Sequence, residues 1–200
     1  MDIVSSLATL SFDKRRSEFF SKELMILLEL IDKKLINVSN LYGSWAGAFG
    51  NFQFMPSTIK NYAIDYDKNN KIELKESLHD AIASAANYMN KIGWKYNSSC
   101  FSKVELTKPI PKKYINTSAK GIKNYLNIKS WKKMGIVDID QINDNNKAAL
   151  IIPDQAVLDG NESSPAFLVF GNYEKILKWN RSLRFGVSVC TLANMIKNEI

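Results

Sequence analysis

Oxygen-bearing side chains recur at close intervals between Asp65 and Glu76, and this spacing constrains the fold more than any other feature of the sequence. Counted from Asp65, such side chains stand at positions 1, 3, 5, 9 and 12, and an isoleucine stands at position 8. Oxygens spaced in this way converge on one centre in EF-hand calcium loops. The segment 65–76 therefore predicts a structural Ca²⁺ whose ligands are Asp65, Asp67, Asn69, the carbonyl of Lys71, Glu73 and Glu76.

The loop departs from the EF-hand pattern at one position. Asn70 stands where glycine usually takes the left-handed turn, and asparagine tolerates a positive φ better than other non-glycine residues. An acidic loop of Asx turns without a metal is the alternative interpretation. The flanking sequences do not form a matched EF-hand helix pair, which favours a stabilising ion over a calcium switch.

Apolar residues at three- and four-residue steps predict a helix on each side of this loop. The first begins at Asp13 as its N-cap and ends near Ile36, with an apolar face of Phe20, Leu24, Leu27, Leu28, Ile31 and Leu35. The second begins after Ser77, with Asp80 completing a capping box and Gly93 beyond its end. Its expected buried face is Leu78, Ile82, Ala85, Met89 and Ile92. A last helix is expected from about Ser182.

The helical pattern weakens after residue 95. Short apolar runs predict strands at Val104–Leu106, Ala148–Ile152 and Pro165–Phe170, and Asn143–Asn146 is typical of a turn. We therefore expect an α+β protein that is mainly helical with a small β-containing lobe. The predicted division is a helical part over 1–95, a small mixed lobe over 96–164, and a returning strand and helix over 165–200.

Composition excludes several classes of protein. The net charge is +7, but Lys supplies 23 of the 27 basic residues and Arg only four. The sequence has no arginine-rich stripe with interleaved aromatics, the pattern that would predict nucleic-acid binding. No apolar run approaches the roughly 18 residues of a membrane span. The first residues have no basic region before the apolar ones and no recognisable cleavage site, so we expect no secretory signal in this sequence, which leaves cytoplasmic retention open.

The two cysteines stand far apart. Cys100 and Cys190 form no CxxC motif, which excludes the zinc and redox motifs built on that spacing. Two buried free thiols are favoured over one disulfide.

Glycines and aromatic residues alternate from Gly43 to Ser57. Three glycines are set among Trp45, Phe49, Phe52 and Phe54. This mixture in a loop favours close approach of the backbone to a ligand, although a buried turn would have the same sequence.

Several ordered motifs resemble one family. They are Ser6-Leu-Ala-Thr-Leu-Ser-Phe-Asp13 with Arg15-Arg16, Gly43-Ser-Trp-Ala-Gly-Ala-Phe-Gly50, Gln53-Phe-Met-Pro-Ser57, the loop 65–76, Ala86-Asn-Tyr88 before Gly93-Trp94, and Pro165-Ala-Phe-Leu-Val169 with Trp179-Asn-Arg-Ser182. Together they resemble the bacterial lytic murein transglycosylases of the membrane-bound transglycosylase B type. The resemblance implies a lysozyme-like fold and a periplasmic enzyme that cuts peptidoglycan glycan strands between N-acetylmuramic acid and N-acetylglucosamine, forming a 1,6-anhydro product.

The resemblance also implies that the catalytic acid is missing from these residues. In the family, one Glu lies upstream of the segment that matches Leu-Ala-Thr-Leu, and the sequence begins just before that segment. We therefore expect an N-terminally truncated domain whose partners are glycan strands and a separate upstream polypeptide. Glu18 and Glu23 are the nearest acids, and neither is expected to replace the missing one, because geometry must precede pKa.

The resemblance carries a substrate-binding role to a further set of positions. These positions are Ser44, Gln53, Tyr88, Trp179, Asn180 and Phe185. Trp179 and Phe185 stand where relatives carry Tyr, and the family directs the second of those hydroxyls at the site. The structural alternatives are a turn or cap for Ser44, a satisfied core amide for Gln53, and plain core for Tyr88 and Phe185.

Three functions therefore remain in view. The first is a truncated lytic transglycosylase domain. The others are a non-catalytic peptidoglycan-binding remnant and a calcium-stabilised structural module.

Overall fold

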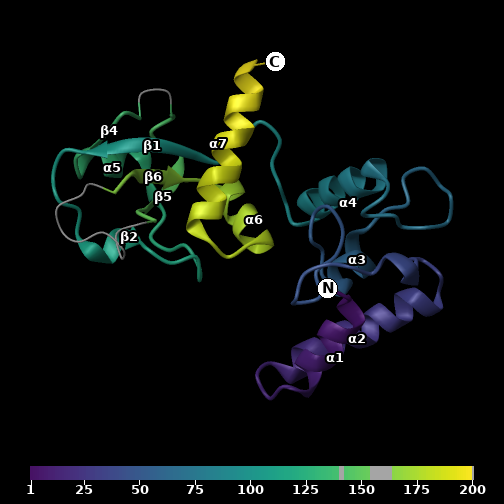
Figure 1. Cartoon of the computed structure of the whole chain (residues 1–200). Coiled ribbons are helices and arrows are strands. Elements are labelled where there is room, and N and C mark those ends of the chain that lie inside the picture. The colour runs from purple at the N-terminus through teal and green to yellow at the C-terminus, as the bar shows by residue number, and fades with distance from the viewer. Residues whose placement is uncertain (140–141, 154–163, 200) are drawn as a thin grey trace. The chain divides into compact units, whose positions relative to one another are not determined.

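The computed structural model describes residues 1–139, 142–153 and 164–199. Its internal contacts divide the chain into two units, Met1–Gly93 and Trp94–Ile200 (Figure 1).

The first unit is built from helices. They are α1 (Ile3–Phe12), α2 (Ser17–Asp32), the 3₁₀ helix η1 (Val38–Asn40), α3 (Pro56–Tyr62) and α4 (Leu78–Lys91). Asp2 begins α1, because its carboxylate accepts a hydrogen bond from the Ser5 amide at 2.7 Å. The fully buried side chains of Ile3, Leu7 and Leu27 form the core between α1 and α2.

The prediction of one helix starting at Asp13 is wrong. Asp13 ends α1, and the next helix begins only at Ser17, after Arg16 with a φ of 64°. A residue in the left-handed region interrupts helical hydrogen bonding, so the helix begins only at Ser17, and Leu35 of the predicted apolar face lies beyond its end at Asp32. The buried face of α2 also differs from the expected one, because Glu23 is buried there while Leu28 is exposed.

The helix expected after Ser77 is confirmed as α4, but of its predicted buried face only Ala85 is buried. The Ser77 hydroxyl accepts from the Asp80 amide at 3.2 Å, and Gly93 follows the helix with a φ of 90°. The residues buried on α4 are Asp80, Ala81, Ser84 and Ala85, whereas Leu78 and Ile82 are 64% and 57% exposed. Hydrogen bonds to loop backbone decide the packed face: Asp80 accepts from Tyr66 and Glu73, and Ser84 accepts from Ile64.

The second unit contains a small mixed sheet. Its strands are β1 (Phe101–Leu106), β2 (Ile115–Asn116), β3 (Leu126–Asn127), β4 (Ile136–Val137), β5 (Lys147–Ile151) and β6 (Ala166–Val169). The order is β2-β5-β6-β1-β4, with β3 also pairing β5. The three predicted strands and the turn at Asn143–Asn146 are confirmed.

A cluster of buried apolar side chains holds this sheet against α5 (Ile128–Lys133). Trp131 is fully buried in it and donates its indole N–H to the carbonyl of Ala148 at 2.8 Å. After β6 the chain forms α6 (Gly171–Trp179) and the longer α7 (Leu183–Glu199), which pack on each other (Figure 1). The start of the last helix is therefore as predicted.

The expectation of two free thiols is wrong. Cys100, just before β1, and Cys190 in α7 form a disulfide across 90 residues, with Cα atoms 6.0 Å apart. Sequence separation says nothing about distance in the fold, and the sheet brings the start of β1 beside α7.

Because β6 lies between β5 and β1, the sheet includes residues on both sides of the boundary expected at 164/165. The three-part division of the chain stays a prediction, and residues 154–163 of the expected mixed lobe lie outside the described residues. Among the described helices, none is long and apolar enough to cross a membrane.

Candidate functional site

The acidic loop folds back on itself through its own backbone. The amide of Asn69 donates to Asp65 at 3.1 Å and to Asp67 at 3.2 Å, and the amide of Asn70 donates to Asp65 at 2.8 Å. Asn69 also donates its side-chain amide to Glu73 at 2.8 Å. Asn70 has a φ of 66°, so it occupies the left-handed turn expected of the missing glycine. These bonds fit both a metal loop and a set of Asx turns.

Three carboxylates meet in this loop, and sequence reasoning missed one of them. Oxygens of Asp65, Asp67 and Asp80 lie within 4.8 Å of one another. Asp80 is fully buried, and its two oxygens accept from the Tyr66 amide at 2.9 Å and the Glu73 amide at 3.0 Å. Three converging carboxylates are the donor set that a hard cation such as Ca²⁺ prefers. The residues present therefore fit the ion.

The available signal for Asp80 was its position four residues after Glu76, at the start of a predicted helix. The sequence predicts a capping box there: the Asp80 amide does donate to the Ser77 hydroxyl, but the Asp80 carboxylate accepts from the amides of Tyr66 and Glu73. Of the predicted ligands, Asp65 and Asp67 belong to the carboxylate cluster, and Glu73 contacts it through Asn69. Lys71 and Glu76 lie exposed in the same loop segment.

The glycine-rich loop contains a tight turn at Ser44–Ala48. The Ser44 hydroxyl accepts from the Ala48 amide at 3.0 Å, and the Ser44 amide donates to the Ala48 carbonyl at 2.8 Å. Gly47 has a φ of 85° and approaches the side chain of Leu7 so closely that a Cβ there would collide with it. Close packing on α1 therefore accounts for this glycine.

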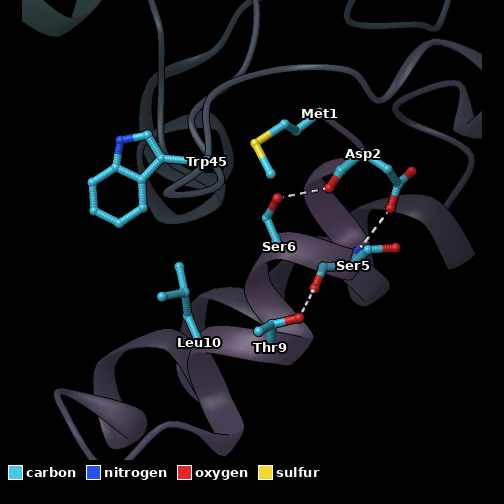
Figure 2. Close-up of a pocket in the computed structure, with 7 residues that line it drawn as sticks. All are labelled: Met1, Asp2, Ser5, Ser6, Thr9, Leu10 and Trp45. Atoms are coloured by element: carbon cyan, nitrogen blue, oxygen red, sulfur yellow. Dashed lines mark hydrogen bonds between the residues drawn. The ribbon is translucent and has the colours of Figure 1, made fainter.

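A hollow of about 430 Å³ lies between this turn and α1, and we call it the α1 hollow. It is lined by Met1, Asp2, Ser5, Ser6, Thr9, Leu10 and Trp45 (Figure 2). The hydroxyls of Ser6 and Thr9 donate to the carbonyls of Asp2 and Ser5 at 2.9 and 2.8 Å. The indole of Trp45 is 66% exposed at its rim. Hydroxyls beside an exposed aromatic ring form a surface that suits a sugar, which is itself amphipathic.

Tyr88 contacts Phe54, the residue that follows Gln53 in the chain. Gln53 is exposed, has a φ of 54° and donates its side-chain amide to Gly50 at 2.9 Å, so it is not a core amide. The adjacent Phe54 pairs with Phe49 through two backbone hydrogen bonds of 2.9 Å. The ring of Phe54 lies 5.9 Å from the ring of Tyr88. Burial raises the pKa of the Tyr88 hydroxyl, which therefore stays protonated near neutral pH.

The remaining predicted residues belong to the second unit. Trp179 ends α6, and Asn180 is its exposed C-cap, with its amide donating to Ile176 at 3.1 Å. Phe185 is half-buried in the first turn of α7, where its amide donates to the Ser182 hydroxyl at 3.3 Å. The structure thus groups Trp179, Asn180 and Phe185 around the α6–α7 connection.

The acids near the N-terminus are all engaged in hydrogen bonds. Glu23 is 4% exposed and accepts from the amide and the hydroxyl of Ser57 at 2.8 and 2.7 Å. Glu18 is exposed and paired with Lys22 at 2.7 Å. In the α1 hollow, hydrogen bonds from Ser5 lower the pKa of the Asp2 carboxyl, so it is ionised near neutral pH and cannot donate a proton.

Comparison with known proteins gives matches over nearly the whole chain. The family model described as Transglycosylase SLT domain matches residues 1–194. The membrane-bound lytic murein transglycosylase B of Escherichia coli (strain K12) is 46% identical over 93 residues, which make up 46% of this chain and 26% of that protein. The chain thus matches about a quarter of this curated relative.

The similar solved structures include two lytic transglycosylases with bound molecules. SltB3 from Pseudomonas aeruginosa in complex with NAG-NAM-pentapeptide has a TM-score of 0.85 and 31% identity, covering 98% of this chain and 51% of that chain. The Escherichia coli lytic transglycosylase Slt35 in complex with calcium has a TM-score of 0.81 and 29% identity, covering 100% of this chain and 60% of that one. This chain therefore spans between a half and two thirds of these relatives, and its lysozyme-like α+β fold is as expected.

Proposed function

The chain belongs to the transglycosylase SLT domain family, and from that premise we propose that it is part of a lytic transglycosylase that cuts the glycan strands of peptidoglycan. The substrate class is supported by the peptidoglycan fragment bound to SltB3. The observation that carries the proposal is the family match over residues 1–194, within which the Ser44 turn lies beside the α1 hollow.

The proposed reaction needs a proton donor at the glycosidic oxygen. General acid catalysis typically contributes about 10²- to 10⁴-fold. One carboxylic acid suffices here, because the group that protonates the leaving oxygen can then accept the proton of the sugar's own C6 hydroxyl as that oxygen closes the 1,6-anhydro ring. Asp2 is ionised, Glu23 is held by Ser57 and Glu18 by Lys22. We propose that the acid is supplied by another segment, in this polypeptide or a separate one.

Ser44, Gln53, Tyr88, Trp179, Asn180 and Phe185 are proposed to bind the glycan. The exposed indole of Trp45 at the rim of the α1 hollow and the hydroxyls that line this hollow support a sugar-binding surface in the first unit. The α6–α7 connection offers an aromatic ring and an exposed amide in the second. The apolar face of a sugar stacks on an aromatic ring, and its hydroxyls form hydrogen bonds with an amide.

The acidic loop is proposed to hold a structural Ca²⁺. The converging carboxylates of Asp65, Asp67 and Asp80 support it, as does the calcium in the Slt35 structure. The ion would stabilise the loop and supply no step of the reaction. A periplasmic location is proposed on the substrate, which lies outside the cytoplasm, and on the disulfide, since disulfides persist in oxidising compartments.

The test is digestion of purified peptidoglycan with mass detection of 1,6-anhydro-muramoyl products. The 200-residue chain alone should bind glycan weakly and release none of these products. A peptide carrying the family's Glu-bearing helix should restore cleavage, whereas the same peptide with Gln for Glu should not. Anhydro products from the chain alone would assign the acid to these residues and make Glu23→Gln and Glu18→Gln the next variants. Failure of the Glu-bearing peptide to restore cleavage would favour a non-catalytic glycan-binding protein.

A further inference from the structure

The segment Lys95–Cys100, which we call the clasp, is fastened to α6 by one buried side chain. Asn172 is 2% exposed, and its carbonyl oxygen accepts from the Lys95 amide at 2.9 Å. Its amide nitrogen donates to the carbonyls of Lys95 at 2.8 Å and Ser98 at 2.9 Å. A buried amide that makes three bonds to one loop fixes the path of that loop relative to the helix.

The clasp also reaches α7 through its last residue. The carbonyl of Cys100 accepts from the amide of Phe170, the N-cap of α6, at 2.9 Å. Its sulfur is bonded to Cys190 of α7, and both cysteines are buried. Cys100 therefore joins the start of one helix to the middle of the other.

The two helices are also held together along their length. The fully buried Tyr173 donates its hydroxyl to the carbonyl of Leu183 at 2.6 Å. Gly186 faces the same ring, and a Cβ there would lie 2.8 Å from it. The α6–α7 pair is thus a hairpin that the clasp holds at the start of α6 and the middle of α7, with Trp179 at the end of α6 and Asn180 at the start of the connection.

We propose that the clasp is a positioning device for glycan binding: Asn172 and the Cys100–Cys190 disulfide hold the α6–α7 connection in the conformation that receives a sugar. The inference rests on the proposed function, because that function assigns the glycan to Trp179 and Asn180. A connection held in its bound conformation loses less conformational entropy on binding, which raises affinity without any new contact.

Because the disulfide forms only under oxidising conditions, the conformation of the α6–α7 connection depends on the compartment in which the protein folds. Its formation removes two protons and two electrons from the thiols of Cys100 and Cys190, and a thiol–disulfide exchange partner takes them up as its own disulfide becomes a dithiol. Burial of both sulfurs protects the bond from exchange afterwards. Oxidation in the periplasm would thus complete the glycan-binding surface after export.

The experiment uses the full chain, oxidised, and a Cys100→Ser, Cys190→Ser double variant. Amide hydrogen exchange over 179–186 and the Kd for a soluble NAG-NAM-pentapeptide fragment are measured well below the unfolding temperature. In the double variant we expect exchange to accelerate at least tenfold and Kd to rise several-fold. Asn172→Ala should act in the same direction, with its disulfide intact.

The matched control is Trp131→Phe, which removes the buried hydrogen bond to Ala148 in the same unit and leaves the clasp untouched. It should lower the unfolding temperature while changing neither exchange over 179–186 nor Kd. If the disulfide only stabilised the fold, the control and the double variant would show the same changes in exchange over 179–186 and in Kd. That result would overturn the proposal.

Two further outcomes separate this inference from the proposed function. Alkylation of both cysteines in the native protein, or unchanged exchange in the double variant, would overturn the clasp whether or not glycan binds. Faster exchange in the double variant, together with no binding by the oxidised parent, would count against the proposed function and against any role of the clasp in glycan binding.

Discussion

At the scale of single residues, Asp80 is the most informative side chain of the acidic loop. It is fully buried beside Asp65 and Asp67, so a bound cation would offset the repulsion among three carboxylates. Glu76, at the last position of the EF-hand pattern, lies exposed. The sequence pattern thus predicts Glu76 as a ligand, whereas the fold places Asp80 beside Asp65 and Asp67.

We predict that Ca²⁺ at 100 times its Kd stabilises the protein by about 2.7 kcal/mol, and that chelation removes this gain. Asp67→Asn should weaken the calcium-dependent shift of the unfolding temperature, and Asp80→Asn should abolish it. Glu76→Gln is the comparison variant and should retain most of the shift. The measurement is thermal unfolding with and without Ca²⁺. Equal shifts in the parent and in Asp80→Asn would show that the carboxylate cluster holds no metal.

A second residue-scale prediction concerns Phe185, which lies half-buried in the first turn of α7. Once a Glu-bearing segment restores cleavage, Phe185→Tyr should raise turnover roughly tenfold, because a hydroxyl aimed at the reacting sugar stabilises developing charge. Steady-state release of anhydro products measures the effect. Unchanged turnover would mean that this position of α7 does not face the substrate.

At the scale of elements, α3 depends on a cap from outside itself. Its N-cap Met55 has no capping side chain, and the Glu23 carboxylate of α2 accepts from the Ser57 amide instead. The first amides of a helix lack partners and favour negative charge. The buried Glu23 therefore links α2 to the first turn of α3, the helix that follows the glycine-rich loop.

Glu23→Ala is predicted to destabilise the first unit by about 1.5–3 kcal/mol, the contribution of hydrogen bonds to a charged group. Glu29→Gln is the control. Hydrogen bonds from Lys33 and Lys60 lower the pKa of Glu29 to about 2. Its contribution is present above the unfolded pKa and is lost as pH falls towards 2. Because the side chain of Glu29 is 37% exposed and that of Glu23 is buried, the control should have the smaller effect in denaturant titrations at neutral pH. Equal losses of unfolding free energy in the two variants would mean that Glu23 does not cap α3 more strongly than a surface ion pair stabilises the protein.

At the scale of the whole molecule, each unit has its own core and its own stabilising device. The acidic loop lies in Met1–Gly93, and the disulfide lies in Trp94–Ile200. A chain with two cores need not unfold in one step.

We therefore predict two separable responses in unfolding. Ca²⁺ should raise only the transition of the first unit, and the Cys100→Ser, Cys190→Ser variant should lower only that of the second. Hydrogen exchange followed by peptide mass analysis assigns each response to its residues. A single transition shifted by both treatments would mean that the units unfold together.

Local patterns determined much of this protein. The periodicity after Ser77 predicted α4 with its cap and terminal glycine, and the apolar runs predicted three strands, because these signals depend on neighbours a few residues apart. The ordered motifs identified the family, which the match over residues 1–194 confirms. The residue roles inferred from that family stay predictions.

Only the tertiary structure decided which partners distant residues find. It turned α4 so that Asp80 is buried and Leu78 exposed, and it paired Cys100 with Cys190. Each result depends on contacts outside the pattern of the helix or strand itself: amides of the acidic loop reach Asp80, and the disulfide joins the start of β1 to α7. Hydrogen-bond demand at buried sites outweighed the hydropathy of single residues, and a one-dimensional pattern does not contain that demand.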